Sequence, residues 1–303
     1  MSAPVISPGF HDLVDVGVAP EKIATGFFFT EGPIWMKDGS LHFSDIPNDV
    51  RRRWHPTEGL STVRQPSNKC NGMTLDNDGH LVVCEHSTSR VIRETGAGQV
   101  QIVASHYRGK ELNSPNDVIV ASDNSVIFTD PEWGRTVAAV GRERPLELPF
   151  RGVFRVPANG GEPQLLVDDF AGPNGLCFSP DEKLLYINDS LRAHIRVFDV
   201  GPDFELSNGR VFASGIGAGV LGQPTVDGMK VDELGNVYVT GPGGIWIFTA
   251  TGERLGVLAF PEDVNNFNWG GDEWTTLFVA AATSIFRIEL RVSGNLLPYM
   301  RRG

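Results

Sequence analysis

Long apolar segments and disulfide spacing are missing from this sequence of 303 residues, and we expect no signal peptide. Its longest apolar runs, such as residues 277–282, fall far short of the ~20 residues that cross a bilayer, so we expect no membrane partner. Residues 1–10 lack the basic start and apolar core of a signal peptide, which predicts a cytoplasmic location. The cysteines, Cys70, Cys84 and Cys177, are odd in number and lack CxxC spacing, so they are predicted to be reduced core thiols.

Basic charge is also scarce. The chain has 26 Lys and Arg against 37 Asp and Glu, a net charge of −11, whereas nucleic-acid binding needs clustered positive charge. The run Arg51-Arg52-Arg53 precedes Trp54 within an expected strand, and we interpret it as a solvated strand edge. No P-loop, GxSxG or HExxH motif is present, and no GxGxxG motif leads from a strand into a helix, so none of these chemistries is predicted.

What the sequence does contain is short alternating apolar and polar runs. Examples are residues 40–44, 195–198 and 236–239, each followed or preceded by Gly, Asp or Asn. Windows with apolar residues at helical spacing are few, whereas glycine (35) and proline (20) are plentiful. This pattern predicts an all-β protein.

An internal repeat organises these strands. Five segments begin with an acidic or amide residue. In each of them a turn lies seven residues after this opening residue, and the next strand starts with an apolar residue ten residues after it. A sixth segment fits the same pattern with one inserted residue. The opening residues of the six segments are Glu31, Asn71, Asn116, Asn174, Asp227 and Asn266. The intervals between them are 40, 45, 58, 53 and 39 residues, which suits four-stranded units joined by loops of varying length.

Six such repeats predict a six-bladed β-propeller. Closing the sheets into a ring removes exposed strand edges, which would otherwise favour aggregation. Residues 26–29 are predicted to form a strand that completes the last blade and joins the chain ends. We expect residues 1–303 to form a single domain, with residues 135–149 inserted as a loop over one face.

The opening residues predict a central metal site. The first strand of each propeller blade lies along the axis, so all six side chains would surround the central channel at one depth. Carboxylate and amide oxygens without His or Cys favour a hard cation, Ca²⁺ or Mg²⁺, and two carboxylates, Glu31 and Asp227, would balance its charge. The alternative is that dipeptides such as Asn71-Gly72 and Asn174-Gly175 only form hairpin turns, although each segment already has a turn seven residues later.

A second group of acidic residues is expected at the same face, where the second strand of each blade ends. Its members are Asp45, Glu85 with the neighbouring His86, Asp130 and Asp189. They would form an acidic rim around the metal site, although each of them singly is as readily explained as a turn or cap partner. His86 is the histidine best placed to contact a ligand.

Several motifs resemble the gluconolactonase branch of the SMP-30/gluconolactonase family. The resemblance extends from about residue 20 to residue 290, with the motifs in the family's order. The motifs lie at residues 30–33 (TEGP), 112–118 (LNSPNDV), 128–131 (FTDP), 174–176 (NGL), 178–181 (FSPD), 227–229 (DGM) and 241–246.

This resemblance implies a six-bladed propeller that hydrolyses a sugar lactone with one axial divalent ion. The implied metal ligands are Glu31, Asn174 and Asp227, and Asn116 is implied as a further ligand or substrate contact. Calcium is the ion we expect, with magnesium, manganese, zinc or iron(II) as alternatives. In some branches of the family, the residue two positions before the one that corresponds to Asn116 is an Arg that binds substrate. This chain has Ser114 there, so that contact is not carried over.

The expected substrate is a gluconolactone-like 1,5- or 1,4-aldonolactone, converted to the aldonic acid by a monomer or homodimer. The ion would polarise the lactone carbonyl, and Asp227 would be the general base, or would help to activate a water at the ion. Asn71, His86 and Asp130 are the further candidates for substrate binding or additional ligation. Two alternatives stay open: hydrolysis of phosphotriesters or other esters at the same site, and a propeller that only binds other proteins.

Overall fold

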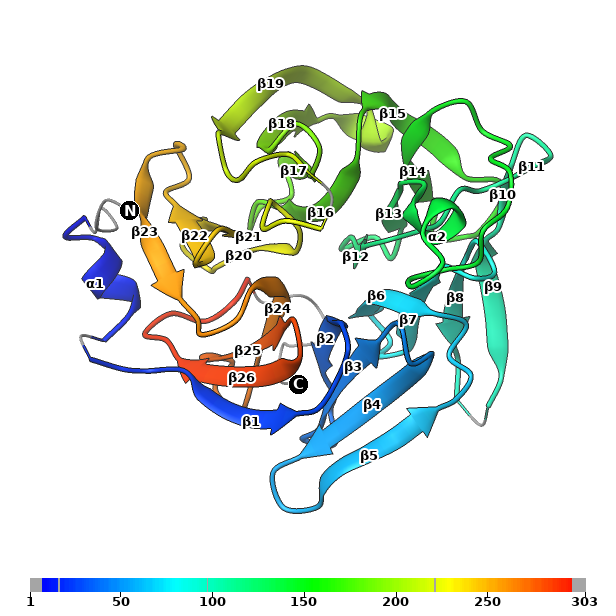
Figure 1. The fold of residues 1–303 in the computed structure, drawn as a ribbon. Helices are drawn as coiled ribbons and strands as arrows, with labels where there is room; N and C mark the ends of the chain where they lie inside the picture. Colours follow the sequence, from blue (N-terminus) through cyan, green and yellow to red (C-terminus); the bar gives the residue numbers. More distant parts are fainter. Residues whose placement is uncertain (1–6, 16, 97, 221, 296–303) are drawn as a thin grey trace.

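Four-stranded antiparallel sheets arranged in a ring make up this chain (Figure 1). The computed structural model describes residues 7–15, 17–96, 98–220 and 222–295. Within these residues six such sheets follow one another around the axis, and the all-β prediction of a six-bladed propeller is confirmed. The predicted single domain of residues 1–303 includes ends that lie outside the described residues, so it stays a prediction.

The first three sheets follow the first three repeats. The first contains β2 (Thr30–Trp35), β3 (Leu41–Asp45), β4 (Val50–His55) and β5 (Gly59–Arg64). The second contains β6 (Cys70–Leu75), β7 (Leu81–Glu85), β8 (Arg90–Glu94) and β9 (Val100–Ala104). The third contains β12 (Val118–Val120), β13 (Val126–Asp130), β14 (Arg151–Val156) and β15 (Gln164–Phe170).

The other three sheets complete the ring. The fourth contains β16 (Pro173–Phe178), β17 (Leu184–Asp189), β18 (His194–Val200) and β19 (Leu206–Ser214). The fifth contains β20 (Met229–Val231), β21 (Val237–Gly241), β22 (Gly244–Phe248) and β23 (Arg254–Ala259). The last contains β24 (Val264–Gly270), β25 (Thr276–Ala281), β26 (Ser284–Glu289) and β1 (Glu21–Thr25).

In the part of the chain that the structure describes, helical structure is confined to three short pieces. They are α1 (Phe10–Leu13), α2 (Trp133–Thr136) and the 3-10 helix η1 (Pro202–Phe204), and a two-stranded hairpin joins β10 (His106–Tyr107) to β11 (Lys110–Glu111). None of the helices in the described ranges is long and apolar enough to cross a bilayer.

The ring is closed by a strand from the N-terminal part of the chain, as expected, but a different segment supplies it. β1 pairs with β26, matching Lys22 with Phe286, and the two lie side by side in Figure 1. The prediction that residues 26–29 form the closing strand is wrong. The chain turns at Gly26, whose left-handed φ of 96° ends β1. Residues 26–29 instead lead from the last blade into the first.

Burial follows the predicted radial order of the strands. β2, β6, β16 and β24 are buried along their whole length, whereas outer strands such as β5 and β9 are largely exposed. Apolar side chains pack between neighbouring sheets; for example, Trp35 of β2 stacks on Phe278 of β25 with ring centroids 4.7 Å apart. The opening residues therefore belong to the most enclosed strands, or directly precede them, next to the axis.

Two smaller predictions have different outcomes. The three cysteines are buried and unpaired, as expected for reduced core thiols. The solvated strand edge predicted at residues 51–53 is wrong for Arg51, which is only 4% exposed on the third strand of its sheet. Its guanidinium donates two hydrogen bonds to the carboxylate of Glu94 in the next blade, at 3.0 and 2.8 Å. The buried guanidinium of Arg51 is thus paired, and this ion pair links the first two blades.

Candidate active site

A cavity of about 380 Å³ opens on one face of the ring at the propeller axis. Its lining includes five of the six opening residues, Glu31, Asn71, Asn116, Asn174 and Asp227. They come from five different blades, so residues at equivalent positions of the sequence repeat lie together around one cavity. Together they form what we call the floor of the cavity.

The sixth opening residue, Asn266, lies behind the floor. Its Nδ2 donates a hydrogen bond of 2.9 Å to Oε2 of Glu31, and its neighbour Asn265 lines the cavity. Asn266 is 3% exposed. It therefore supports a floor residue rather than facing the open space.

A chain of amide hydrogen bonds links the floor residues of neighbouring blades. Asn71 Nδ2 donates to Asn116 Oδ1, and Asn116 Nδ2 donates to Asn174 Oδ1 at 2.9 Å. Asn174 Nδ2 in turn donates to Ser190 Oγ at 3.1 Å, and Ser190 Oγ donates to the carbonyl of Val226. Because Asn116 and Asn174 each accept one of these hydrogen bonds and donate another, their side-chain oxygens have fixed positions at the floor.

Glu31 is a buried carboxylate that accepts its hydrogen bonds from neutral donors. Its Oε2 accepts hydrogen bonds from the backbone N–H of Gly32 at 2.7 Å and from Asn266, and within the described part of the chain it forms no ion pair with Lys or Arg. Burial and the nearby charge of Asp117 raise the pKa of Glu31 from 4.5 to about 7, despite these hydrogen bonds.

Asp227 is held by its backbone so that its side chain faces the cavity. Its N–H donates to Thr240 Oγ1 at 2.8 Å, and its carbonyl accepts a hydrogen bond of 2.6 Å from Asn188 Nδ2. Burial raises the pKa of Asp227 well above its ordinary value, and the charges of Glu31 and Asp117 add to the effect. The charge of Glu31 thus disfavours ionisation of Asp227, and both carboxyl groups on the floor have raised pKa values.

The donor set fits a divalent cation. Two mutually repelling carboxylates and the amide oxygen of Asn174 converge on one cavity, and neither carboxylate is neutralised by an ion pair with a described Lys or Arg. A hard cation prefers oxygen donors of this type, and its positive charge would lower the raised pKa values of both carboxyl groups.

Glycine residues allow the floor to form. A Cβ on Gly175 would lie 2.2 Å from the carbonyl oxygen of Asp227, and one on Gly32 would lie 2.2 Å from the carbonyl oxygen of Asn71. These glycines therefore sit where the backbones of neighbouring blades approach each other closely. The turn-only interpretation of dipeptides such as Asn174-Gly175 is wrong, because this one lies within β16 and the hairpin turn follows that strand.

His86 connects the floor to the inserted segment. It lines the cavity, is 2% exposed, and burial lowers its pKa to about 4, so the ring is neutral. Nδ1 lies 3.0 Å from the carbonyl of Val140, which can only accept, so Nδ1 carries the proton. Nε2 is then the acceptor for Asn71 Nδ2 at 3.1 Å.

The geometry does not support a direct role for Asp130 in substrate binding. Its side chain is fully buried, is not part of the cavity lining, and accepts a hydrogen bond of 2.8 Å from the backbone N–H of Asn113. Burial raises its pKa to about 7. Asp189 behaves similarly and accepts backbone hydrogen bonds from both flanking loops, as at Gly172 and Leu191. Both carboxylates therefore accept hydrogen bonds from loop backbone N–H groups, as in the alternative that these acidic residues are turn or cap partners.

The inserted segment contributes a wall that the sequence did not reveal. The prediction placed residues 135–149 over one face, and the structure shows that Trp133, Val137 and Val140 line the cavity. Its anchor is Arg135, 2% exposed, whose guanidinium donates to the carboxylate of Glu111 and to several backbone carbonyls. The apolar residues of this segment carried no motif that could have marked them.

Ser114 also serves the inserted segment rather than the substrate. Its Oγ donates to the carbonyl of Pro131 and accepts a hydrogen bond from the N–H of Gly134 at 3.0 Å. Ser114 is fully buried and is not part of the cavity lining. The position that holds an Arg in some branches is therefore used here to fix the start of the wall.

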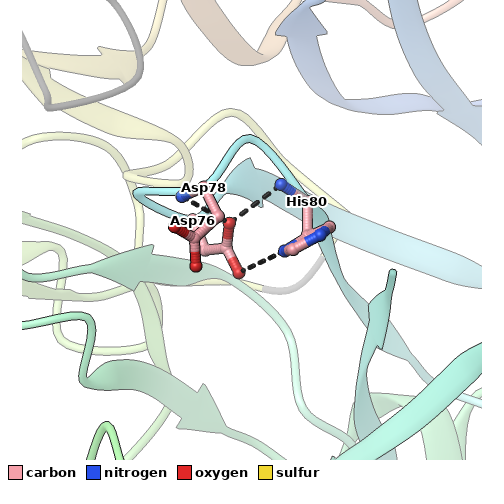
Figure 2. Close-up of side chains that lie close together, drawn as sticks. All are labelled: Asp76, Asp78 and His80. Carbon is pink, nitrogen blue, oxygen red and sulfur yellow. Dashed lines mark hydrogen bonds and ion pairs between the residues drawn. The ribbon is translucent and has the colours of Figure 1, made fainter. Parts of the chain in front are cut away.

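A second acidic cluster lies away from the cavity. Figure 2 shows Asp76, Asp78 and His80 in the turn between β6 and β7. Asp76 accepts backbone hydrogen bonds from both Asp78 and His80 and forms an ion pair of 2.8 Å with Arg93. These contacts are those of a hairpin turn whose buried carboxylate is already satisfied, so we do not assign this cluster as a metal centre.

Comparison with known proteins agrees with the geometry. Residues 29–283 match the family model described as the SMP-30/Gluconolactonase/LRE-like region. The chain belongs to the SMP-30/gluconolactonase family. A curated gluconolactonase from Zymomonas mobilis is 32% identical over 311 residues, which cover 95% of this chain and 86% of that relative.

Solved structures of the family superpose closely on this propeller. A putative gluconolactonase has a TM-score of 0.89 at 31% identity, covering 96% of this chain and 98% of its own. A gluconolactonase from Xanthomonas campestris has a TM-score of 0.86 at 28% identity, covering 95% and 94%. A calcium-binding regucalcin from Agrobacterium tumefaciens, with a TM-score of 0.71 at 17% identity and coverage of 90% and 95%, shares the fold.

Proposed function

We propose that this chain is a lactonase that hydrolyses a sugar lactone to the aldonic acid in the axial cavity. The observation that carries this function is the convergence of Glu31, Asn174 and Asp227 on the cavity floor, in a propeller whose relatives include gluconolactonases. Hydrolysis of a lactone needs stabilisation of the carbonyl oxygen as it gains negative charge and a base for the attacking water. The floor offers oxygen ligands for a cation and a carboxylate for the base.

A divalent cation would be held by Glu31, Asn174 and Asp227, with Asn116 beside them. When bound, it would supply Lewis-acid polarisation of the lactone carbonyl. Calcium is the ion we propose, because the donors are all oxygens and the amide network gives them unequal surroundings, which calcium tolerates better than magnesium does. The name of the regucalcin from Agrobacterium tumefaciens describes it as calcium-binding.

Asp227 is the proposed general base. Its carboxylate would take a proton from the water that attacks the carbonyl carbon and would return that proton to the ring oxygen as the C–O bond breaks. The net reaction adds one water to the lactone. Its backbone contacts to Thr240 and Asn188 hold the side chain toward the cavity, so the carboxylate needs little reorganisation during the reaction.

Asp227→Asn tests this assignment. The variant keeps the shape of the side chain and removes the base, so we expect kcat for glucono-1,5-lactone to fall by about 10²-fold or more. The measurement is the initial rate of acid release, corrected for spontaneous hydrolysis, together with circular dichroism to confirm folding. A near-normal kcat in the folded variant would refute the role of Asp227.

Asp78→Asn is the matched control. Asp78 lies in the turn after β6, at the opposite end of that strand from Asn71, and belongs to the acidic cluster that we do not assign as a metal centre. We expect unchanged kcat and unchanged cation content. Loss of the cation in this variant would move the proposed metal centre to the turn.

A further inference from the structure

Above its polar floor, the cavity is walled mainly by apolar side chains. The wall includes Val137 and Val140 from the inserted segment, Trp133 just before it, and Leu191 and Val264 from other blades. Phe29, Ile46, Pro224 and Ala282 add further apolar surface. A ligand that fills the cavity therefore meets oxygens at one end and hydrocarbon over most of the rest.

Most polar side chains in the wall are already engaged. Ser190 Oγ donates to the carbonyl of Val226 at 2.7 Å, Thr225 Oγ1 donates to the carbonyl of Ser190 at 2.9 Å, and Asn265 Nδ2 donates to the carbonyl of Thr30 at 3.1 Å. Both ring nitrogens of His86 are also engaged. Few donors or acceptors are thus left for hydroxyl groups that lie above the floor.

Gln223 and Asp263 are the wall residues whose side chains make no hydrogen bond to the rest of the described chain. Among the described residues that line the cavity none is Lys or Arg, so a phosphate or carboxylate on the substrate would find no cationic side chain and would face Asp263. Part of this apolar lining is open to solvent, since Leu191 is 39% exposed.

We propose that the site takes an uncharged aldonolactone whose exocyclic end is apolar, either deoxygenated or acylated. This inference rests on the proposed function and specifies its substrate. The polar ring lies against the floor, and the apolar end lies along the wall of Trp133, Val137 and Val140. These three residues determine substrate specificity, whereas the floor residues contact the reacting atoms.

Two physical effects set the expected preference. A hydroxyl buried against this wall without a partner would lower kcat/KM about 5- to 150-fold relative to the deoxy compound. Each methylene of an acyl chain that is buried on the wall would raise kcat/KM about 4-fold, until the chain passes the rim.

The experiment compares lactones that share one ring. The substrates are glucono-1,5-lactone, its 6-deoxy analogue, its 6-O-hexanoyl ester and its 6-phosphate, and the measurement is kcat/KM of the cation-loaded wild-type protein. We expect the 6-deoxy and 6-O-hexanoyl compounds to exceed the parent at least 5-fold and the 6-phosphate to be the poorest substrate. An equal or higher kcat/KM for the parent lactone overturns the inference and leaves the proposed function intact. No hydrolysis of any of the four overturns both.

The double variant Val137→Thr/Val140→Thr locates the preference. Threonine matches the shape of valine, so the change adds two hydroxyls to the wall with little effect on packing volume. The advantage of the 6-O-hexanoyl ester over the parent lactone should fall about 10-fold. Val211→Thr, on the outer strand β19 where the residue is 57% exposed, is the control and should leave this advantage unchanged. An unchanged advantage in the double variant contradicts the assigned wall.

Discussion

Replacing Glu31 by Gln should stabilise the cation-free protein at neutral and higher pH while weakening its cation binding. The substitution removes a negative charge at a residue that is only 3% exposed. Gln keeps one side-chain oxygen, so it can still accept the hydrogen bonds that Gly32 and Asn266 donate to Glu31. The change therefore isolates the cost of the buried charge.

The loss of folding stability caused by the charge of Glu31 follows from its raised pKa. Burial and the charge of Asp117 raise the pKa of Glu31 from 4.5 to about 7, so the folded state binds this proton more tightly than the unfolded state does. Stability is consequently lost as pH rises from about 4.5 through about 7, and the loss is complete at about pH 8. It amounts to roughly 3 kcal/mol, which corresponds to about 5 °C in Tm for a protein of this length.

Thermal unfolding of chelator-treated wild type and Glu31→Gln over this pH range is the assay. We expect nearly equal Tm values at about pH 4.5 and a Tm about 5 °C higher for the variant at about pH 8. Added calcium should reverse the order at about pH 8, because only the wild type gains stability from tight binding. Equal Tm values at both pH extremes without the cation would refute the buried-charge reasoning.

Glu262→Gln is a control of opposite sign. Burial would raise the pKa of Glu262, but hydrogen bonds from Ser284, Lys22 and Thr283 outweigh it and lower the pKa to about 2. This carboxylate therefore contributes stability above its unfolded pKa, and that stability is lost as pH falls toward about 2. Glu262→Gln should lower Tm at about pH 8, with or without calcium.

Two further substitutions test the scaffold of the site. Gly175→Ala places a Cβ 2.2 Å from the carbonyl oxygen of Asp227, so it should lower Tm and weaken calcium binding about 10-fold or more by titration calorimetry. Gly201→Ala is the control: its Cβ would lie a longer 3.2 Å from the carbonyl oxygen of Glu205, and Gly201 does not line the cavity, so calcium affinity should be unchanged. Arg135→Leu leaves several buried acceptors unpaired and should cost about 3–5 kcal/mol in denaturant unfolding, with KM raised more than kcat is lowered; Arg142→Leu, an exposed change in the same segment, should do neither. Wild-type affinity in Gly175→Ala, or wild-type stability in Arg135→Leu, would contradict these roles.

The ring and its floor could be predicted because both rest on a repeat. Constant offsets from Glu31, Asn71 and Asn174 to a turn and then to an apolar residue fix which residues begin each inner strand. A ring of equivalent strands then brings those residues together without further information. The same regularity predicted that the chain ends meet in one sheet.

The remaining details depend on contacts between blades, which leave little trace in local sequence. Gly26 and the apolar Phe27 and Phe29 suggested a strand, but the glycine turns the chain and the closing strand lies earlier. A glycine after an opening residue is a turn signal in the sequence, whereas Gly175 instead makes room for the carbonyl of Asp227 from the next blade. Such close approaches appear only once the ring is assembled.

The inserted segment shows the same limit for the site. Charge and proline in residues 135–149 marked it as a loop, yet its function depends on Arg135 being buried and on His86 reaching the carbonyl of Val140. Both contacts join segments that are distant in sequence. Sequence patterns therefore identified the floor of the site, and packing between blades determined its wall.

A calcium-dependent lactonase site on the cavity floor can be tested by calorimetric titration of the chelator-treated protein with calcium, combined with lactone hydrolysis measured on the same samples. We expect one calcium per chain, a large loss of affinity in Glu31→Gln and in Asp227→Asn, and wild-type hydrolysis that disappears with chelator and returns with calcium. Full hydrolysis of glucono-1,5-lactone by the metal-free protein, or calcium affinity that neither substitution alters, would contradict it.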